Sequence, residues 1–313
     1  CRSKKVNGMD PIRDKILKRS KESNQDIIGK ILSYAAIVLI LAVVVSIFAF
    51  VFAKGIATFT ENHASLKDFL TGTDWNPNSK GEDGKPLVGA LPMIVRSFAV
   101  TLLAALFATP FAIGTALYMT ELSSSKGRAF MQSVVELLVG IPSVVYGFIG
   151  LTVVVPFVRS HFGGSGYGIL SGAFVLFVMV LPTITSMTVD SLKAVPKHYK
   201  SASLALGATE WQTIWRVILR AALPGIMTAV VFGMARAFGE ALAVQMVIGN
   251  ASLLPTSLTN PASTLTSVLT MGIGNTVMGT VANNALWSLA LVLLLMSLFF
   301  NILVRMISRK GRM

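Results

Sequence analysis

Residues 233–250, GMARAFGEALAVQMVIGN, are apolar or small almost throughout, and the stretch is long enough to lie in a membrane. It nevertheless contains Arg236 and Glu240. Side chains four positions apart share one face of a continuous helix, so the spacing predicts an ion pair. A charged side chain at the middle of a bilayer costs at least about 2.5–3.5 kcal/mol. This face is therefore expected to turn toward other spans or a water-filled path rather than toward lipid.

The composition of the whole chain indicates a membrane protein. Of its 313 residues, 53% are hydrophobic and 13% are charged, well below the charged quarter that is usual in soluble domains. The net charge of +13 does not indicate nucleic-acid binding, because the basic residues lie in short segments between apolar runs. We predict an all-α polytopic protein whose partner is the lipid bilayer. Its six transmembrane helices are expected at residues 29–54, 93–120, 130–157, 168–189, 221–249 and 280–305.

The distribution of Lys and Arg over the loops predicts the orientation. With the N-terminus inside, twenty of the 27 basic residues fall in cytoplasmic segments and six outside, and Arg236 is the remaining one. Both termini are thus expected in the cytoplasm. The predicted order is a cytoplasmic segment 1–28, a first helix 29–54, an outer loop 55–92, a five-helix core 93–305 with a cytoplasmic loop 190–220, and a cytoplasmic tail 306–313.

Several kinds of chemistry are not expected of this chain. It contains no G-x-x-x-x-G-K-[ST] sequence, so we do not expect it to hydrolyse ATP itself. Its three histidines are scattered among loops and its single cysteine is at position 1, so no metal site is predicted. No nucleophile and base are recognisable, so no catalytic residue is predicted, and a membrane-embedded enzyme is the weakest of the alternatives.

The cytoplasmic segment 190–226 reads DSLKAVPKHYKSASLALGATEWQTIWRVILRAALPGI. Small residues crowd positions 201–208, Gly207 interrupts the helical pattern, and apolar residues then recur at helical spacing. This predicts a helix–turn–helix at the membrane surface, where small side chains let another protein approach closely. An ordinary amphipathic interfacial helix remains the alternative.

The same segment resembles the EAA loop of ABC-importer permeases, whose pattern is E-A-A-x-x-x-G-x9-I-x-L-P. Ala202, Gly207, Val217 and Leu219 fall in register, whereas three positions depart from the pattern, namely Ser201, Ser203 and Arg220. In that family the loop is a coupling helix that fits a groove on the ATPase subunit. The resemblance therefore implies a coupling surface formed by Ser201, Ala202, Ser203, Gly207 and Ala208.

A wider resemblance covers roughly residues 65–305. The stretches that carry it are TDWNP (73–77), GALPMI (89–94), ELLVGIPSVVYGF (136–148), ALGATEWQTI (205–214) and ARAFGEALAVQMVIGN (235–250). Together they resemble the PstC-type phosphate permease family. The resemblance implies a type I ABC-importer permease in a prokaryotic cell membrane, working with a second permease of PstA type, two copies of a PstB-type ATPase that hydrolyses ATP, and a PstS-type extracytoplasmic phosphate-binding protein. The chain itself is expected to bind no cofactor.

With this resemblance, Arg236 is expected to contact the transported anion, because its planar guanidinium suits phosphate oxygens and stays charged when desolvated. Glu240 is expected to hold and balance it, and Glu136 is a further candidate on the path. The alternatives are a purely structural pair, and an interfacial, solvated Glu136. The sequence GIPS (140–143) predicts either a bend beside the path or a packing irregularity.

Two other transport functions stay open. One is a permease of the same superfamily for sulfate or molybdate. The other is a secondary anion transporter, whose typical sign is a pair of inverted repeats with broken helices.

Overall fold

The computed structural model describes residues 21–81, 84–251 and 257–310. The chain divides into two compact units, residues 1–53 and residues 54–313. Parts of the predicted N-terminal segment 1–28 and C-terminal tail 306–313 lie outside the described residues. The predicted topology of these two segments therefore stays a prediction.

The first helix, α2 (Lys21–Thr60), is longer than the predicted 29–54. Its sequence contains no proline, so nothing stops the helix between its polar start and Thr60. Its last residues belong to the second unit and pack on α14 (Val281–Lys310). The Ser288 hydroxyl donates to the carbonyl of Gly55 at 2.7 Å and contacts Thr58 Oγ1 at 2.7 Å.

The centre of residues 54–313 is a close pair of helices, α4 (Leu91–Leu117) and α8 (Ile169–Lys193). The row Ala104, Ala108, Ala112 and Ala116 is completely buried in α4. Residues four apart lie on one helix face, so these alanines form a flat strip of methyl groups along α4. Small residues let membrane helices approach closely, which replaces the hydrophobic driving force that lipid does not supply.

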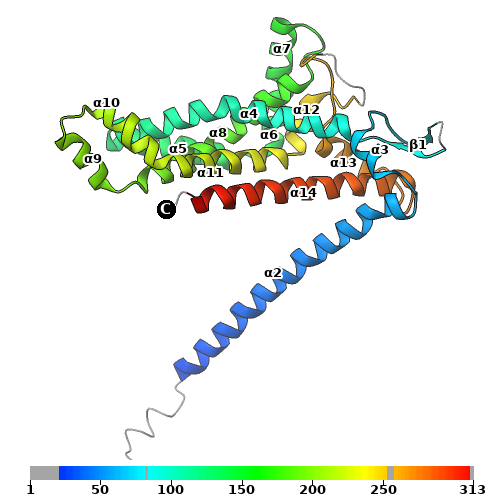
Figure 1. The fold of residues 1–313 in the computed structure, drawn as a ribbon, viewed down its shortest axis with the longest axis horizontal. Helices are drawn as coiled ribbons and strands as arrows, with labels where there is room; N and C mark the ends of the chain where they lie inside the picture. Colours follow the sequence, from blue (N-terminus) through cyan, green and yellow to red (C-terminus); the bar gives the residue numbers. More distant parts are fainter. Residues whose placement is uncertain (1–20, 82–83, 252–256, 311–313) are drawn as a thin grey trace, which may run out of the picture. The chain divides into compact units, whose positions relative to one another are not determined.

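Helix α11 (Leu219–Phe238) packs on α8 and on α14, and the four long helices run alongside one another (Figure 1). Gly233 brings α11 close to α8, since a Cβ there would lie 2.6 Å from Ile184 Cγ1. On the other side, the rings of Phe238 and Phe300 lie 5.6 Å apart between centroids. Small residues and aromatic rings thus fill the two faces of α11.

Shorter helices complete the body, and several follow one another with little or no loop. Helix α4 continues as a π-helical turn, η1 (Tyr118–Leu122), before α5 (Ser125–Gly140). The next helical segment consists of α6 (Ser143–Ile149), η2 (Gly150–Val154) and α7 (Val155–Phe162). After α11 come α12 (Leu242–Ile248) and α13 (Leu265–Ile273).

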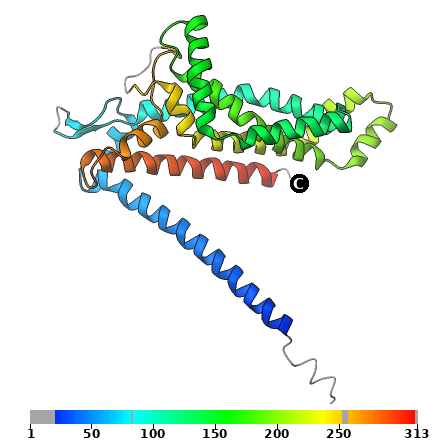
Figure 2. The ribbon, with the colours of Figure 1, turned by 180° about the vertical axis from the view of Figure 1, so that it is seen from behind.

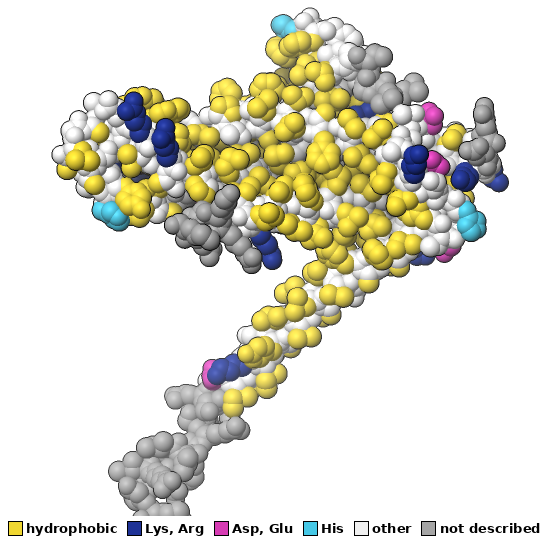
Figure 3. Space-filling model, in the orientation of Figure 1, with side chains coloured by type: hydrophobic (Ala, Val, Ile, Leu, Met, Phe, Trp, Pro, Cys, Tyr) yellow, Lys and Arg dark blue, Asp and Glu magenta, His cyan; other side chains and the backbone are white. Residues whose placement is uncertain are grey.

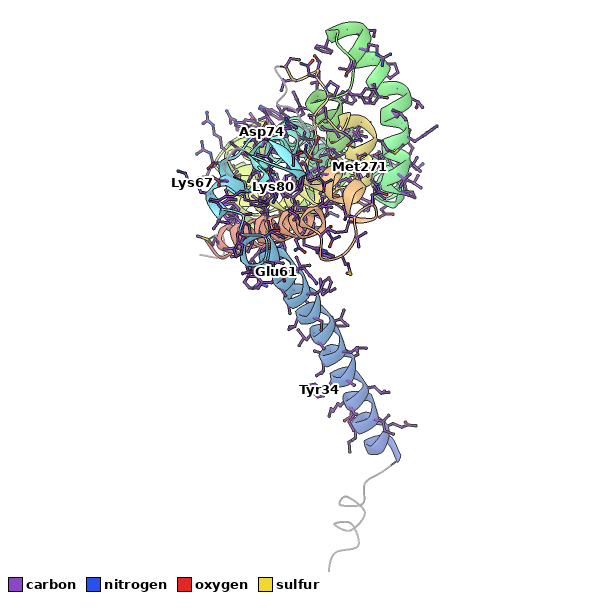
Figure 4. All side chains as sticks on the ribbon, turned by 90° about the vertical axis from the view of Figure 1, so that its right-hand side faces the viewer. Tyr34, Glu61, Lys67, Asp74, Lys80 and Met271 are labelled. Carbon is purple, nitrogen blue, oxygen red and sulfur yellow. The ribbon has the colours of Figure 1, made fainter. Side chains whose placement is uncertain are left out.

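The two ends of this body differ. One end carries α9 (Lys197–Ala205), α10 (Glu210–Thr213) and the π-helical turn η3 (Ile214–Ile218), as Figures 1 and 2 show. The other carries α3 (Leu66–Thr71) and an antiparallel hairpin of β1 (Trp75–Lys80) and β2 (Pro86–Val88), in which Trp75 pairs with Val88. Figure 4 looks onto the hairpin end, where Lys67, Asp74 and Lys80 are labelled. Apolar side chains cover the middle of the face seen in Figure 3, and most charged side chains lie toward the ends.

Six helical segments among the described residues are long and apolar enough to cross a membrane, which confirms the predicted number of spans. Of the predicted spans, the third and the fifth differ most from the observed ones. The third runs over Ser143–Phe162 instead of 130–157, and the fifth over Glu210–Phe238 instead of 221–249. The other four observed spans are Gln25–Thr60, Leu91–Leu122, Ile169–Lys193 and Val281–Ile307.

Candidate functional site

The stretch 233–250 is not one helix. Helix α11 ends at Phe238, Gly239 caps it, and α12 begins at Leu242. The carbonyl oxygen of Glu240, which an unbroken helix would have used, accepts a hydrogen bond from the Thr266 hydroxyl at 3.0 Å instead. A broken backbone inside a membrane protein is tolerated where neighbouring side chains satisfy its polar groups. The predicted continuous helix is therefore wrong at Gly239.

Arg236 lies in the last turn of α11 and is half-buried. Its guanidinium donates a hydrogen bond through Nη1 to the hydroxyl of Thr183, a buried residue of α8. A cation is favourable in the last helical turn because the carbonyl end of a helix is negative. The position of Arg236 thus holds a guanidinium between two packed membrane helices.

Glu240 does not form the predicted ion pair with Arg236. The ion pairs among the residues that the structure describes are Lys30–Asp26 and Lys200–Glu121. One carboxylate oxygen of Glu240 instead accepts from the backbone N–H of Ala243 at 3.3 Å, in the first turn of α12. The prediction failed because it assumed an unbroken helix. Across the break, each charge lies at the helix end whose dipole favours it.

A second break lies at Ile141–Pro142, between α5 and α6. The residue before a proline avoids the helical conformation, and Ile141 is extended, with φ −68° and ψ 127°. The Tyr146 hydroxyl crosses this break and donates to the carbonyl of Leu138 at 2.8 Å. The predicted third span is therefore divided, and GIPS marks a true bend.

The two breaks come together because α6 packs on α12. Gly147 makes this possible, since a Cβ there would lie 2.8 Å from Met246 Sδ and 2.9 Å from Ala243 Cα. The buried Tyr146 lies on α6, and its hydroxyl is used by the carbonyl of Leu138 across the break. The candidate site is thus the guanidinium of Arg236 with the hydroxyl of Thr183, next to the two breaks.

Thr183 and Tyr146 were missed by the sequence reasoning. Each is a hydroxyl side chain in an apolar stretch next to a proline, Thr183 directly after Pro182 and Tyr146 four residues after Pro142. A hydroxyl side chain shortly after a proline in an apolar stretch is the sequence signal that could have found them.

Glu136 is not brought to the site by any contact in the described part of the chain. It is exposed on α5 and accepts a hydrogen bond from Gln132 Nε2 at 2.8 Å, within its own helix. Its position before the bend at Pro142 is the remaining link to the candidate site.

The predicted coupling residues lie together at the α9 end. Ser201, Ala202 and Gly207 are exposed, and Gly207 has the positive φ (+82°) that favours glycine in a turn. A capping box of Thr209 and Gln212 then begins α10. Ser203 and Ala208 are partly buried, and the Ser203 hydroxyl contacts the Thr213 hydroxyl at 2.9 Å. The predicted helix–turn–helix is present.

The apolar residues that follow face two ways. Ile214 and Ile218 are buried, whereas Trp211 and Trp215 are exposed and stacked, with their rings 6.1 Å apart.

Among the described residues, no three His, Cys, Asp or Glu side chains form a group that could hold a metal ion.

The six long, apolar helical segments of the described residues define a class, a multi-pass membrane protein. A family model described as "binding-protein-dependent transport system inner membrane component" matches residues 108–313. The "probable ABC transporter permease protein YqgH" of Bacillus subtilis (strain 168) is 49% identical, and the match covers 95% of each chain. A "phosphate transport system permease protein PstC" of Mesorhizobium japonicum is 34% identical, with 78% of this chain and 80% of the relative covered.

Solved structures have the same fold. A bacterial ABC transporter "involved in the import of the acidic polysaccharide alginate" superposes with a TM-score of 0.61 at 18% identity, over 92% of this chain and 100% of that one. The chain belongs to the family of binding-protein-dependent ABC transporter permeases. It is thus a permease subunit of a bacterial ABC importer. It is not itself catalytic, since the partner ATPase uses the ATP. The family also implies a binding protein as a further partner.

Proposed function

We propose that this chain is the PstC-type permease subunit of an ATP-driven phosphate importer. Its partners in this proposal are a PstA-type second permease, a PstB-type ATPase dimer and a PstS-type extracytoplasmic phosphate-binding protein. The support from comparison is the identity of about a third with permeases named for phosphate transport. The α9 end then faces the cytoplasm, both termini are cytoplasmic, and the hairpin end faces outward.

The observation that carries the proposal is the half-buried Arg236 between α11 and α8. A guanidinium has five N–H donors. In the described part of the chain, one of them is given to Thr183, and no carboxylate forms an ion pair with Arg236. A fork of donors beside the Thr183 hydroxyl suits a tetrahedral oxyanion, because it offers several charge-assisted hydrogen bonds at once.

In this proposal Glu240 does not neutralise Arg236 directly. It holds the first turn of α12 in place and thereby positions the break beside the guanidinium. Glu136, exposed on α5 before the bend, stays a further candidate on the path. The switch between inward and outward access comes from ATP and the binding protein, because a ligand shifts a two-state equilibrium only by its different affinity for the two states.

The test is uptake of inorganic phosphate by proteoliposomes that contain the complete complex, with Arg236→Leu and Arg236→Lys compared with the unchanged complex. Each hydrogen bond between Arg236 and the anion that the variant loses should cost about 1.5–3 kcal/mol. We therefore expect Arg236→Leu to lower uptake at least about tenfold. Arg236→Lys should recover little, because an ammonium lacks the two-pronged donor geometry.

The control is Arg220→Leu, an exposed arginine earlier on the same helix, which should leave uptake unchanged. Each variant must first co-purify with its partner subunits. Near-normal uptake by Arg236→Leu would exclude Arg236 from the path. Uptake of sulfate or molybdate in preference to phosphate would favour the alternative permease function.

A further inference from the structure

Helix α9 is weakly held by packing. None of its residues is buried. Leu206, which caps its end, has 89% of its surface exposed. In the described part of the chain, two polar side-chain contacts link α9 to other elements, one through Ser203 and the other through Lys200. Apart from the chain connections at its two ends and its packing on α10 and η3, these two polar contacts link α9 to the rest of the described fold.

The two contacts lead to different places. Ser203 contacts Thr213 of α10, the next element along the chain. Lys200 Nζ lies 2.6 Å from Glu121 Oε2, a residue 79 positions earlier in the chain. The other described ion pair, Lys30–Asp26, joins neighbouring turns of one helix and is exposed. Among the described residues, Lys200–Glu121 is thus the ion pair that joins distant segments.

Partial burial distinguishes this pair from an ordinary surface contact. The side chain of Glu121 is 13% exposed and that of Lys200 is 37% exposed. Exposed pairs contribute little because water and salt screen them. A pair with one largely buried partner is screened less, so it restrains the distance between its two elements more firmly.

Glu121 lies on a rigid support. It belongs to η1, the π-helical turn that continues α4, and Arg128 holds two carbonyls of that turn. Arg128 Nε donates to Met119 O at 2.7 Å, and Nη2 donates to Thr120 O at 3.2 Å. Helix α4 is in turn packed on α8 along its buried alanine row. A displacement of α9 that moves Glu121 would therefore move α4 and α8 together.

We propose that the Lys200–Glu121 ion pair is a strut that transmits the movement of α9 to the α4–α8 pair, and that both residues position α9 for coupling ATP hydrolysis to transport. The inference rests on the proposed contact of this loop with the ATPase. The ion pair would transmit movement from α9 to α4 outside the proposed coupling surface, because neither residue belongs to the small-residue stretch 201–208.

The experiment measures two rates in the same proteoliposomes holding the complete complex, ATP hydrolysis stimulated by the binding protein and uptake of inorganic phosphate. The variants are Glu121→Gln and Lys200→Met. The ratio of phosphate imported to ATP hydrolysed should fall about fivefold or more, the lower range of coupling between distinct sites. ATP hydrolysis should persist, because the ATPase still binds the exposed loop.

Two variants separate a strut from a folding defect. The exchange Glu121→Lys with Lys200→Glu restores the opposite charges and should return the ratio to within about twofold of the unchanged complex, because coupled residues are not additive. Lys200→Arg keeps a charged donor and should also preserve the ratio. Lys197→Met is the matched control, since Lys197 is exposed on the same helix.

The inference is overturned by an unchanged ratio in both single variants, or by hydrolysis and uptake that fall in equal proportion. It is also overturned if Lys200→Arg and the charge exchange both remain as poorly coupled as Lys200→Met. If the unchanged complex imports another oxyanion but not phosphate, the proposed substrate is wrong, and the same ratio is then measured with that anion.

Discussion

Two of the spans predicted from the sequence are broken next to each other, and the breaks arise by different means. At Ile141–Pro142 a proline forces the bend, and the Tyr146 hydroxyl reaches across it to Leu138. At Gly239 no proline is present. Here the hydroxyl of Thr266, from another part of the fold, donates a hydrogen bond to the Glu240 carbonyl. The first break is local, whereas the second depends on a residue 26 positions away.

This difference separates what one stretch of sequence dictates from what the tertiary fold decides. Proline removes a donor and clashes with the preceding turn wherever it stands. Glycine only lowers helix propensity, by about 1 kcal/mol relative to alanine. A glycine therefore ends a helix only where other contacts favour the end, and here Thr266 supplies one. Each break can be tested by a substitution that its own mechanism makes informative.

The largest effect is expected where the two broken segments touch. Gly147→Ala places a methyl group 2.9 Å from Ala243 Cα, a backbone atom that cannot move aside. Overpacking of this kind costs about 1–3 kcal/mol, so the free energy of unfolding should fall by that amount and α6 should separate from α12. Denaturant titration of the detergent-solubilised complex measures it. Gly140→Ala is the control, because nothing lies within 4 Å of its added Cβ, and equal losses in the two variants would show that the contact is not special.

An intermediate effect is expected for Glu240→Gln. The substitution weakens the carboxylate hydrogen bond to Ala243, and a charge at a helix start is worth about 0.3–1 kcal/mol. Because the structure has no Arg236–Glu240 ion pair, the loss should be the same with arginine or leucine at position 236. Free energies of unfolding of the two single variants and the double variant give the coupling between them, expected within about 0.5 kcal/mol. A coupling of several kcal/mol would instead support the Arg236–Glu240 ion pair that the sequence spacing predicts.

A change of similar size but opposite sign is expected for Gly239→Ala. Gly239 has φ −82° and ψ −4°, which any residue can adopt, and an added Cβ would lie 3.8 Å from its nearest neighbours. Reducing the freedom of the unfolded chain should stabilise by about 0.4–1 kcal/mol, and phosphate uptake should stay unchanged. Uptake assays beside thermal unfolding check both statements. A stable variant that no longer transports would mean that Gly239 must change conformation during the cycle.

Much of the fold could be predicted from the sequence, because lipid imposes strong rules on it. Long apolar runs are expected to be helical in a bilayer, and the described residues contain six helices long and apolar enough to span one. The turn at Gly207 and the bend at Pro142 were also recognisable, since glycine and proline act locally. The bounds of the third and fifth spans were not recognisable. Part of the predicted third span belongs to the separate helix α5, and the observed fifth span begins earlier than predicted, with the polar helix α10.

The site was harder to predict for a physical reason. Arg236 is visible as a charge in an apolar run, but its partner Thr183 lies 53 positions away on another helix. Glu240 seemed the natural partner because four-residue spacing is a rule of continuous helices. The break at Gly239 removes the condition for that rule. Contacts that depend on which helices become neighbours cannot be obtained from spacing within one segment.

The alanine row of α4 has a thermodynamic consequence. Alanine has no side-chain rotamers, so burying Ala104, Ala108, Ala112 and Ala116 restricts no side-chain motion. Leucines at these positions would each lose about 0.5–1 kcal/mol of rotamer freedom on packing. The α4 side of this contact is therefore nearly free of side-chain entropy loss, whereas α8 contributes larger side chains such as Leu176 and Ile184. Close packing of α4 on α8 thus costs less side-chain entropy than a contact lined by long side chains on both helices.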